Sequence, residues 1–382
     1  MKNKMSLQIQ ILTNLNCNLA CTYCYENKGR GANDLEAMER FITARYSELA
    51  EGEERDVNLD FIGGESLMYP ENLDKLCAHA ARLHREKDIK GNLYISTSTN
   101  GTLIAEEPKI QRFLRKWRPA LGFSIDGTKN LHDQCRITPE GEPSYDRAVA
   151  GYRWVRENIP CIYTAVKATY THATIDQYAE GLINLISLGF TDIAANVVFE
   201  EIWDKETDAM RVAVQMVKVV DYLFDNNLED KIHIFQINNK DLDMKNYVPD
   251  TGHKDQNHCG TCTHMRCIGF DEKIYGCNRF CTMKKQMPIG RLTDDNKIFI
   301  TKSGERLSDE VSHQYSDWPD ECKECPYGKQ CPSCSAIPYE QDGAQKFFGR
   351  KPQCGFTHAL VLARMYFKKR LMEKEELPNA LR

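Results

Sequence analysis

The chain has 382 residues, of which 41% are hydrophobic and 27% charged, and its net charge is −5. This length suits two domains or one barrel with an extension, and the weakly acidic balance argues against nucleic-acid or membrane-surface binding. The sequence has neither a signal peptide nor an apolar run of roughly 18 residues. We therefore expect a cytoplasmic protein without a membrane span.

Six stretches in the first two-thirds of the chain predict β-strands, because each is short, rich in β-branched residues and bounded by Gly, Asn or Asp. They are residues 7–13, 57–64, 93–101, 121–127, 163–171 and 192–199. Amphipathic stretches such as 34–50 and 175–189 lie between them, with apolar residues at helical spacing. The alternation predicts an α/β fold with a parallel sheet of six βα units, either doubly wound or a partial TIM-like barrel. Candidate chemical residues at the C-terminal strand ends are typical of a barrel.

A long helical pattern from about residue 204 ends this region, and the sequence then changes to short strands, turns and cysteines. We place a domain boundary near residue 240, with the barrel over 1–240 and a cysteine-rich domain with a short β-hairpin and helices over 241–382. The tail after Cys354 predicts one amphipathic helix.

Sixteen cysteines are unusual for a chain of this kind. In a reducing compartment, clustered cysteines indicate metal ligands rather than a disulfide framework. Three lie near the N-terminus and ten lie between Cys259 and Cys354. We interpret the scattered Cys77, Cys135 and Cys161 as small buried hydrophobic residues.

Cys17, Cys21 and Cys24 follow the first predicted strand in C-x3-C-x2-C spacing. A [4Fe–4S] cluster needs four ligands, so three thiolates leave one iron open to a small molecule. A zinc loop completed by a distant ligand is the alternative for this spacing alone. The spacing and its position resemble those of the radical S-adenosylmethionine (SAM) enzymes. In that family the open iron binds the amino and carboxylate groups of SAM, which is cleaved to methionine and a 5′-deoxyadenosyl radical.

The resemblance to radical SAM enzymes covers roughly residues 8–200, and it implies a SAM site at the strand ends. The implied cofactor-binding residues are Tyr23 on the adenine, Gly63, Gly64 and Glu65 at the amino group, Ser124 at the ribose, Val197 at the adenine, and Asn100 and Asp126 in the matching STNG and SIDG elements. Glycine suits such a place because backbone can approach a ligand with no Cβ in the way. We expect a bulky residue at Gly64 to weaken SAM binding while sparing the cysteine loop.

The segment HDQCR (132–136) matches an HDxxR element of radical SAM enzymes that modify proteins and peptides. The resemblance makes Arg136 a candidate catalytic residue that contacts a carboxylate or the substrate backbone, because a guanidinium binds carboxylates bidentately. An Arg–Asp pair that stabilises the loop is the alternative.

The C-terminal cysteines, with "CKECPYGKQCPSC" and a predicted hairpin upstream, resemble a SPASM domain with two auxiliary [4Fe–4S] clusters. The family pattern implies a nearer cluster held by Cys259, Cys262, Cys277 and Cys334, and a further one held by Cys322, Cys325, Cys331 and Cys354. Together with the N-terminal triad this makes three [4Fe–4S] clusters. Two departures from the pattern are Glu272 at a glycine position and a last gap shorter by one residue. Cys267 and Cys281 are spare, either could replace Cys259, and a double zinc ribbon is the alternative.

SPASM radical SAM enzymes mostly modify peptides or proteins, and one residue separates two groups of them. In anaerobic sulfatase-maturating enzymes, an aspartate after the cysteine matching Cys277 is the catalytic base. Asn278 occupies that position here, and an amide cannot take a proton at neutral pH. We therefore favour a crosslinking enzyme for ribosomally made peptides (RiPPs), with a thioether first, over formylglycine formation. A non-enzymatic multi-cluster electron-transfer protein would not need the SAM-like strand ends.

The same resemblance implies the partners. They are a precursor peptide and a reducing flavodoxin or ferredoxin, with no nucleic acid and no membrane. The 16 residues before Cys17 leave no room for a leader-binding winged helix. We expect the barrel and SPASM surfaces, or a separate leader-binding protein, to recognise the substrate.

Overall fold

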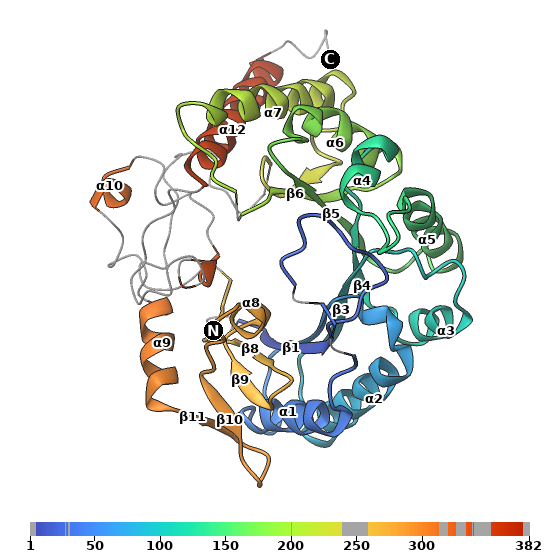
Figure 1. Cartoon of the computed structure of the whole chain (residues 1–382), viewed down its shortest axis with the longest axis vertical. Coiled ribbons are helices and arrows are strands. Elements are labelled where there is room, and N and C mark those ends of the chain that lie inside the picture. Colours follow the sequence, from blue (N-terminus) through green and yellow to red (C-terminus); the bar gives the residue numbers. More distant parts are fainter. Residues whose placement is uncertain are drawn as a thin grey trace.

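The computed structural model describes residues 5–26, 28–29, 31–199, 201–238, 259–312, 320–325, 334–337, 339 and 353–376. Strands and helices alternate through the first part of the chain, and the helices surround the curved sheet (Figure 1). Seven parallel strands follow one another in chain order: β1 (Leu7–Asn14), β2 (Val57–Gly63), β3 (Leu93–Thr99), β4 (Ala120–Ser124), β5 (Thr164–Tyr170), β6 (Asp192–Val197) and β7 (His233–Ile234). All six predicted strands are confirmed. Because the strand order is sequential, the sheet is of the barrel type and not doubly wound.

Helices connect the strands and begin at recognisable signals. They are α1 (Leu35–Ser47), α2 (Pro70–Glu86), α3 (Pro108–Trp117), α4 (Lys129–Cys135), α5 (Tyr145–Asn158), α6 (Tyr178–Ser187) and α7 (Asp208–Asp225), with short 3₁₀ helices η1 (Ser66–Met68) and η2 (Ile175–Gln177). The Asp34 side chain accepts a hydrogen bond from Ala37 N and caps α1. A proline opens both α2 and α3, where the missing N–H costs nothing.

The cysteine-rich region continues the barrel sheet. Strand β8 (Met265–Ile268) pairs in parallel with β1 and forms the predicted hairpin with β9 (Lys273–Tyr275). Strands β10 (Gly290–Leu292) and β11 (Ile298–Ile300) extend the sheet, and the helices here are α8 (Asn278–Thr282), α9 (Lys302–Ser312) and α10 (Asp320–Lys323). The proposed boundary near residue 240 lies outside the described residues. The sheet nevertheless crosses it, since β8 lies beside the first strand.

The tail forms one helix as predicted, α12 (Cys354–Glu376), which packs along α7 (Figure 1). Arg370 Nη2 lies 3.2 Å from an oxygen of Asp225, and Arg364 Nε donates to the Gln236 carbonyl oxygen at 2.8 Å. The chain end therefore returns to the barrel wall. No helix in the described part of the chain is long and apolar enough to cross a membrane.

The interpretation of the scattered cysteines was right for two residues and wrong for one. Cys77 and Cys135 are buried, whereas Cys161 is exposed. Cys161 follows the C-terminal end of α5 in a turn before β5, and local sequence does not say which way such a turn faces.

Candidate active site

A cavity of about 560 Å³ opens at the C-terminal ends of the parallel strands. Four segments line it: the loop after β1 (Thr22, Tyr23, Cys24 and Tyr25), α4 (Gln134 and Cys135), the loop after β5 (Thr171, Ala173 and Thr174) and the chain after β6 (Val198 and Glu201). The cysteine loop and the β6 end thus share one cavity, at the end of the barrel where the sequence places the chemistry.

The three N-terminal cysteines lie on one loop and influence each other. Burial raises the pKa of the Cys17 thiol to about 11, and Cys21 adds to the shift. Burial also raises the pKa of Cys24, with a smaller contribution from Cys21. Leu19 N and Asn100 Nδ2 donate to Cys17 Sγ at 3.4 and 3.8 Å. Such donors stabilise a thiolate, so the loop suits a cluster that lowers these pKa values on ligation.

Within the residues that the structure describes, no group of three or more His, Cys, Asp or Glu side chains is arranged to hold a metal ion.

The two glycines at the end of β2 let that strand lie directly on the cysteine loop. Gly64 N donates to Asn14 O at 3.0 Å, and Glu65 N donates to Asn16 O at 2.8 Å. A Cβ on Gly63, whose φ is +139°, would lie 2.1 Å from Asn14 O, and one on Gly64 would lie 2.0 Å from Asn16 O. This contact argues against the expectation that a larger residue at Gly64 spares the cysteine loop, because Asn16 immediately precedes Cys17.

Glu65 is 1% exposed and joins β2 to the end of β3. Its Oε2 accepts from Asn100 N at 2.7 Å, its Oε1 accepts from Leu67 N at 3.2 Å, and burial raises its pKa to about 7. Asn100 in turn donates from Nδ2 to Asn18 Oδ1 at 2.9 Å. Both residues thus position the Cys17 loop, while their contact with SAM stays a prediction.

Asp126 receives the side chains of two other predicted site residues. Arg136 donates from Nε and Nη2 to the two oxygens of Asp126 at 2.9 and 3.0 Å. The Tyr23 hydroxyl donates to Asp126 Oδ2 at 2.5 Å, and the Arg136 guanidinium lies 5.4 Å from the Tyr23 ring centre. The loop-stabilising Arg–Asp pair, the alternative at the sequence level, is therefore present. A contact of Arg136 with substrate stays a prediction.

Two residues of the HDxxR segment that sequence reasoning passed over hold the same loop. His132 is fully buried, with Nδ1 accepting from Asp126 N at 3.3 Å and Nε2 lying 3.0 Å from Ser144 Oγ. Asp133 Oδ1 accepts from Ser144 N and Tyr145 N, both at 2.9 Å, at the start of α5. The spacing of the HDxxR segment was visible in the sequence. The hydrogen-bond partners of its side chains, Asp126, Ser144 and Tyr145, lie outside the segment and could not be read from it.

Ser124 ends β4 and is half-buried, and Val197 ends β6 and is buried. The residue that lines the cavity at this point is Val198 rather than Val197. Both predicted SAM contacts thus lie at the expected strand ends, and their roles stay predictions.

Of the four thiols expected at the nearer auxiliary cluster, Cys277 influences the other three electrostatically. Burial raises the pKa of Cys259, Cys262 and Cys334, and the neighbouring Cys277 contributes to all three shifts. The spare Cys267 and Cys281 are buried, and Cys277 raises their pKa values as well.

The further auxiliary cluster has less structural support. Cys322 and Cys325 lie at α10, and Cys354 begins α12. Cys331 lies outside the described residues, so this cluster stays a prediction.

Tyr25 and Glu26, which sequence reasoning did not single out, join the first cysteine loop to α8. Asn278 Nδ2 donates to Tyr25 Oη at 3.4 Å, and the Arg279 guanidinium lies 4.1 Å from the Tyr25 ring centre. Burial raises the pKa of Glu26 to about 7, against the effect of Arg279 and Thr282. The residue after Cys277 is thus in contact with the loop that carries Cys24.

Comparison with known proteins shows which family and which enzymes this chain resembles. Residues 11–182 match the model of the Radical SAM superfamily. A serine-type anaerobic sulfatase-maturating enzyme of Bacteroides thetaiotaomicron is 24% identical over 345 residues, covering 82% of this chain and 78% of that enzyme. The radical SAM cyclopropyl synthase TigE of Paramaledivibacter caminithermalis is 20% identical over 58% of this chain and 47% of its own length.

Solved structures share the fold over more of the chain. The structure of anSMEcpe with bound AdoMet and the Cp18Cys peptide has a TM-score of 0.71 and 18% identity, covering 98% of this chain and all of that one. Streptococcus suis SuiB bound to S-adenosylmethionine has a TM-score of 0.55 and 16% identity, over 88% of this chain and 75% of SuiB.

Proposed function

We propose that this chain, whose residues 11–182 match the Radical SAM superfamily, is a radical SAM enzyme that installs an oxidative crosslink in a ribosomally made peptide. A thioether is the first candidate for that crosslink. One relative is named as a sulfatase-maturating enzyme and another as a radical SAM cyclopropyl synthase. These names support a protein or peptide substrate.

The observation that carries this proposal is the cavity shared by the cysteine loop and the β5 and β6 ends. Cys17, Cys21 and Cys24 would hold a [4Fe–4S] cluster at this cavity, and SAM bound there would supply a 5′-deoxyadenosyl radical. Gly63, Gly64, Glu65, Asn100, Ser124, Asp126 and Val197, together with Tyr23, stay the proposed SAM contacts or supports. The remaining space, between Tyr25 and Glu201, would admit the reacting part of a peptide.

The C-terminal region would accept the second electron that the oxidation of the substrate releases. Removal of a hydrogen atom leaves a carbon radical on the substrate. One more electron must be removed from the substrate to complete the new bond. Cys277 is the N-cap residue of α8, and its charge contributes to the raised pKa values of Cys259, Cys262 and Cys334. Helix α8 also contacts the first cysteine loop through Asn278 and Tyr25. We propose that these four cysteines hold an auxiliary cluster that accepts this electron, that a further cluster completes a set of three, and that flavodoxin or ferredoxin reduces the enzyme.

Formylglycine formation is the second candidate, favoured by the sulfatase-maturating relative that covers most of the chain. Asn278 argues against it, because its amide donates to Tyr25 Oη and cannot take a proton. If Asn278 is the deciding residue, Asn278→Asp should give the enzyme activity on a sulfatase-derived peptide that the unaltered enzyme lacks. An aldehyde-reactive probe would measure that product.

Mass spectrometry tests the reaction class. The enzyme is co-expressed with a candidate precursor peptide, and we expect the peptide to lose two hydrogens per modification. A fragment pattern interrupted between a cysteine and its partner would locate a thioether. An aldehyde at a cysteine or serine would favour the second candidate. Absence of SAM cleavage after dithionite reduction would instead favour an electron-transfer protein.

A further inference from the structure

The proposed crosslink requires a base, and the position after Cys277, where related enzymes carry an aspartate, holds Asn278 in this chain. Closing a thioether removes a proton from a substrate thiol, and Asn278 cannot accept it. A carboxylate near the reacting group is the simplest replacement.

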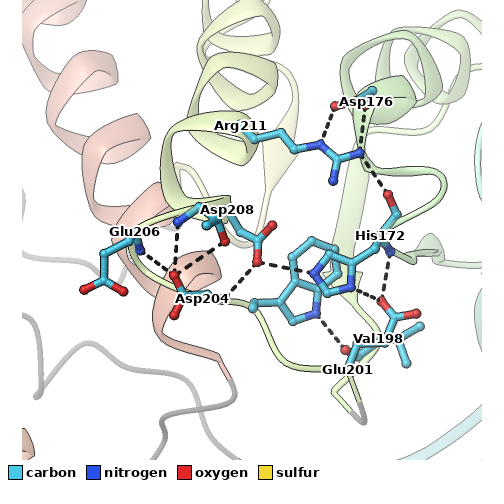
Figure 2. A network of polar contacts seen from close by, with 10 residues as sticks. His172, Asp176, Val198, Glu201, Asp204, Glu206, Asp208 and Arg211 are labelled. Atoms are coloured by element: carbon cyan, nitrogen blue, oxygen red, sulfur yellow. Dashed lines mark hydrogen bonds and ion pairs between the residues drawn. The ribbon is translucent and has the colours of Figure 1, made fainter.

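Among the described residues that line the cavity, Glu201 is the only carboxylate. It follows β6, and its side chain is 32% exposed. One of its oxygens, Oε2, accepts from His172 N at 2.8 Å and lies 3.1 Å from His172 Nδ1 (Figure 2).

His172 is itself held in place on three sides. Its ring stacks on the buried Trp203 with centres 3.9 Å apart, and its Nε2 lies 3.3 Å from Asp208 Oδ2 (Figure 2). Arg211 donates to the His172 carbonyl oxygen at 2.9 Å while pairing with Asp176. Each ring nitrogen thus faces a carboxylate oxygen, so the imidazole can pass a proton between Glu201 and Asp208.

The segment that carries Glu201 is fixed from the other side by the tail helix. Trp203 Nε1 donates to Val198 O at 2.9 Å, and Gly355 N at the start of α12 donates to Trp203 O at 2.6 Å. Asp208 Oδ2 also accepts from Asp204 N at 2.8 Å. Such fixed surroundings are what a positioned acid–base group needs.

We propose that Glu201 is the general base of this enzyme and that His172 and Asp208 position it and carry its proton away. The proposal rests on the oxidative peptide modification proposed above. SAM bound at the cavity would supply the radical that takes the hydrogen atom of a substrate C–H bond, and the Glu201 carboxylate would take the proton of the S–H bond. An oxidised iron–sulfur cluster would accept the remaining electron as the C–S bond forms, so the peptide would lose two hydrogens in all.

The test separates hydrogen abstraction from bond formation. With the precursor peptide identified by its loss of two hydrogens, Glu201→Gln should lower crosslink formation about 100-fold. Transfer of deuterium from labelled peptide into 5′-deoxyadenosine should continue, and SAM binding measured by equilibrium dialysis should stay within twofold. Glu201→Asp should recover part of the product. Acetate should restore product to Glu201→Ala, because a small carboxylate can occupy the vacated space.

Glu206→Gln is the matched control, since it removes the same charge five residues away on an exposed side chain paired with Lys205. Product formation within threefold of the unaltered enzyme in Glu201→Gln would overturn the proposal. So would a parallel loss of SAM binding and deuterium transfer, which would make Glu201 a SAM contact. Loss of crosslink formation in Glu26→Gln, with product formation kept in Glu201→Gln, would also overturn the proposal. It would make Glu26, next to the Tyr25 that contacts Asn278, the base instead. If the unaltered enzyme makes formylglycine, Glu201→Gln should lower formylglycine formation in the same way, because that reaction also removes a proton from the substrate. If the unaltered enzyme alters no peptide, both the proposed function and the proposed base fail.

Discussion

At the residue scale, His132 shows how one buried ring controls the loop that holds Asp126. Because Nδ1 accepts from Asp126 N, the neutral ring must carry its proton on Nε2, facing Ser144 Oγ. Burial lowers the pKa of His132 to about 4. In the unfolded chain its pKa is about 6.5, so the unfolded state binds the extra proton more readily. The stability contributed by the neutral ring is present above pH 6.5 and is lost as the pH falls towards 4.

We predict that His132 accounts for about 2 kcal/mol of the stability lost between pH 7 and pH 5. Urea unfolding of the anaerobically purified protein, followed by circular dichroism, measures this loss. His132→Asn keeps an acceptor for Asp126 N but does not titrate, so its stability should depend less on pH. Equal pH dependence in both proteins would show that His132 does not titrate as this environment requires.

At the element scale, the end of β2 and the cysteine loop form a backbone-to-backbone contact that only glycine permits. A Cβ at Gly64 meets a backbone oxygen at 2.0 Å, and backbone cannot move aside as a flexible side chain can. We predict that Gly64→Ala separates β2 from the Cys17 loop and weakens both the first cluster and SAM binding. Iron content and equilibrium dialysis with SAM measure the two effects.

Gly31→Ala is the matched control for that substitution. A Cβ there would have its nearest neighbour at 3.8 Å, so we expect no change in iron or SAM binding. A Gly64→Ala protein with full iron content and weakened SAM binding would instead restore the original expectation, in which Gly64 faces the ligand alone.

At the scale of the whole molecule, one sheet joins the barrel to the cysteine-rich region, and Tyr25 joins the first cysteine loop to α8. We predict that Cys17, Cys21 and Cys24 changed together to alanine lose about one third of roughly twelve irons and all SAM cleavage. Iron analysis and detection of 5′-deoxyadenosine after dithionite reduction check both parts. The C-terminal clusters should remain because their cysteines lie on other elements.

Cys161→Ala controls for the loss of a thiol as such, since Cys161 is exposed and belongs to no proposed ligand set. It should keep the full iron content and SAM cleavage. An unchanged iron content in the triple variant would mean that the N-terminal cysteines hold no cluster.

The six longer parallel strands, the helices α1, α6, α7 and α12, the hairpin and the segments that carry the cysteines were all predictable from the sequence. Those features follow from local periodicity and spacing, which a short stretch expresses without help from the rest of the chain. Only the tertiary structure decided that Arg136 pairs with Asp126, that Gly64 packs on Asn16, that β8 joins β1 and that Glu201 shares a cavity with Cys24. Each of these joins segments separated along the chain, and their meeting depends on the register of the sheet and the packing of its loops.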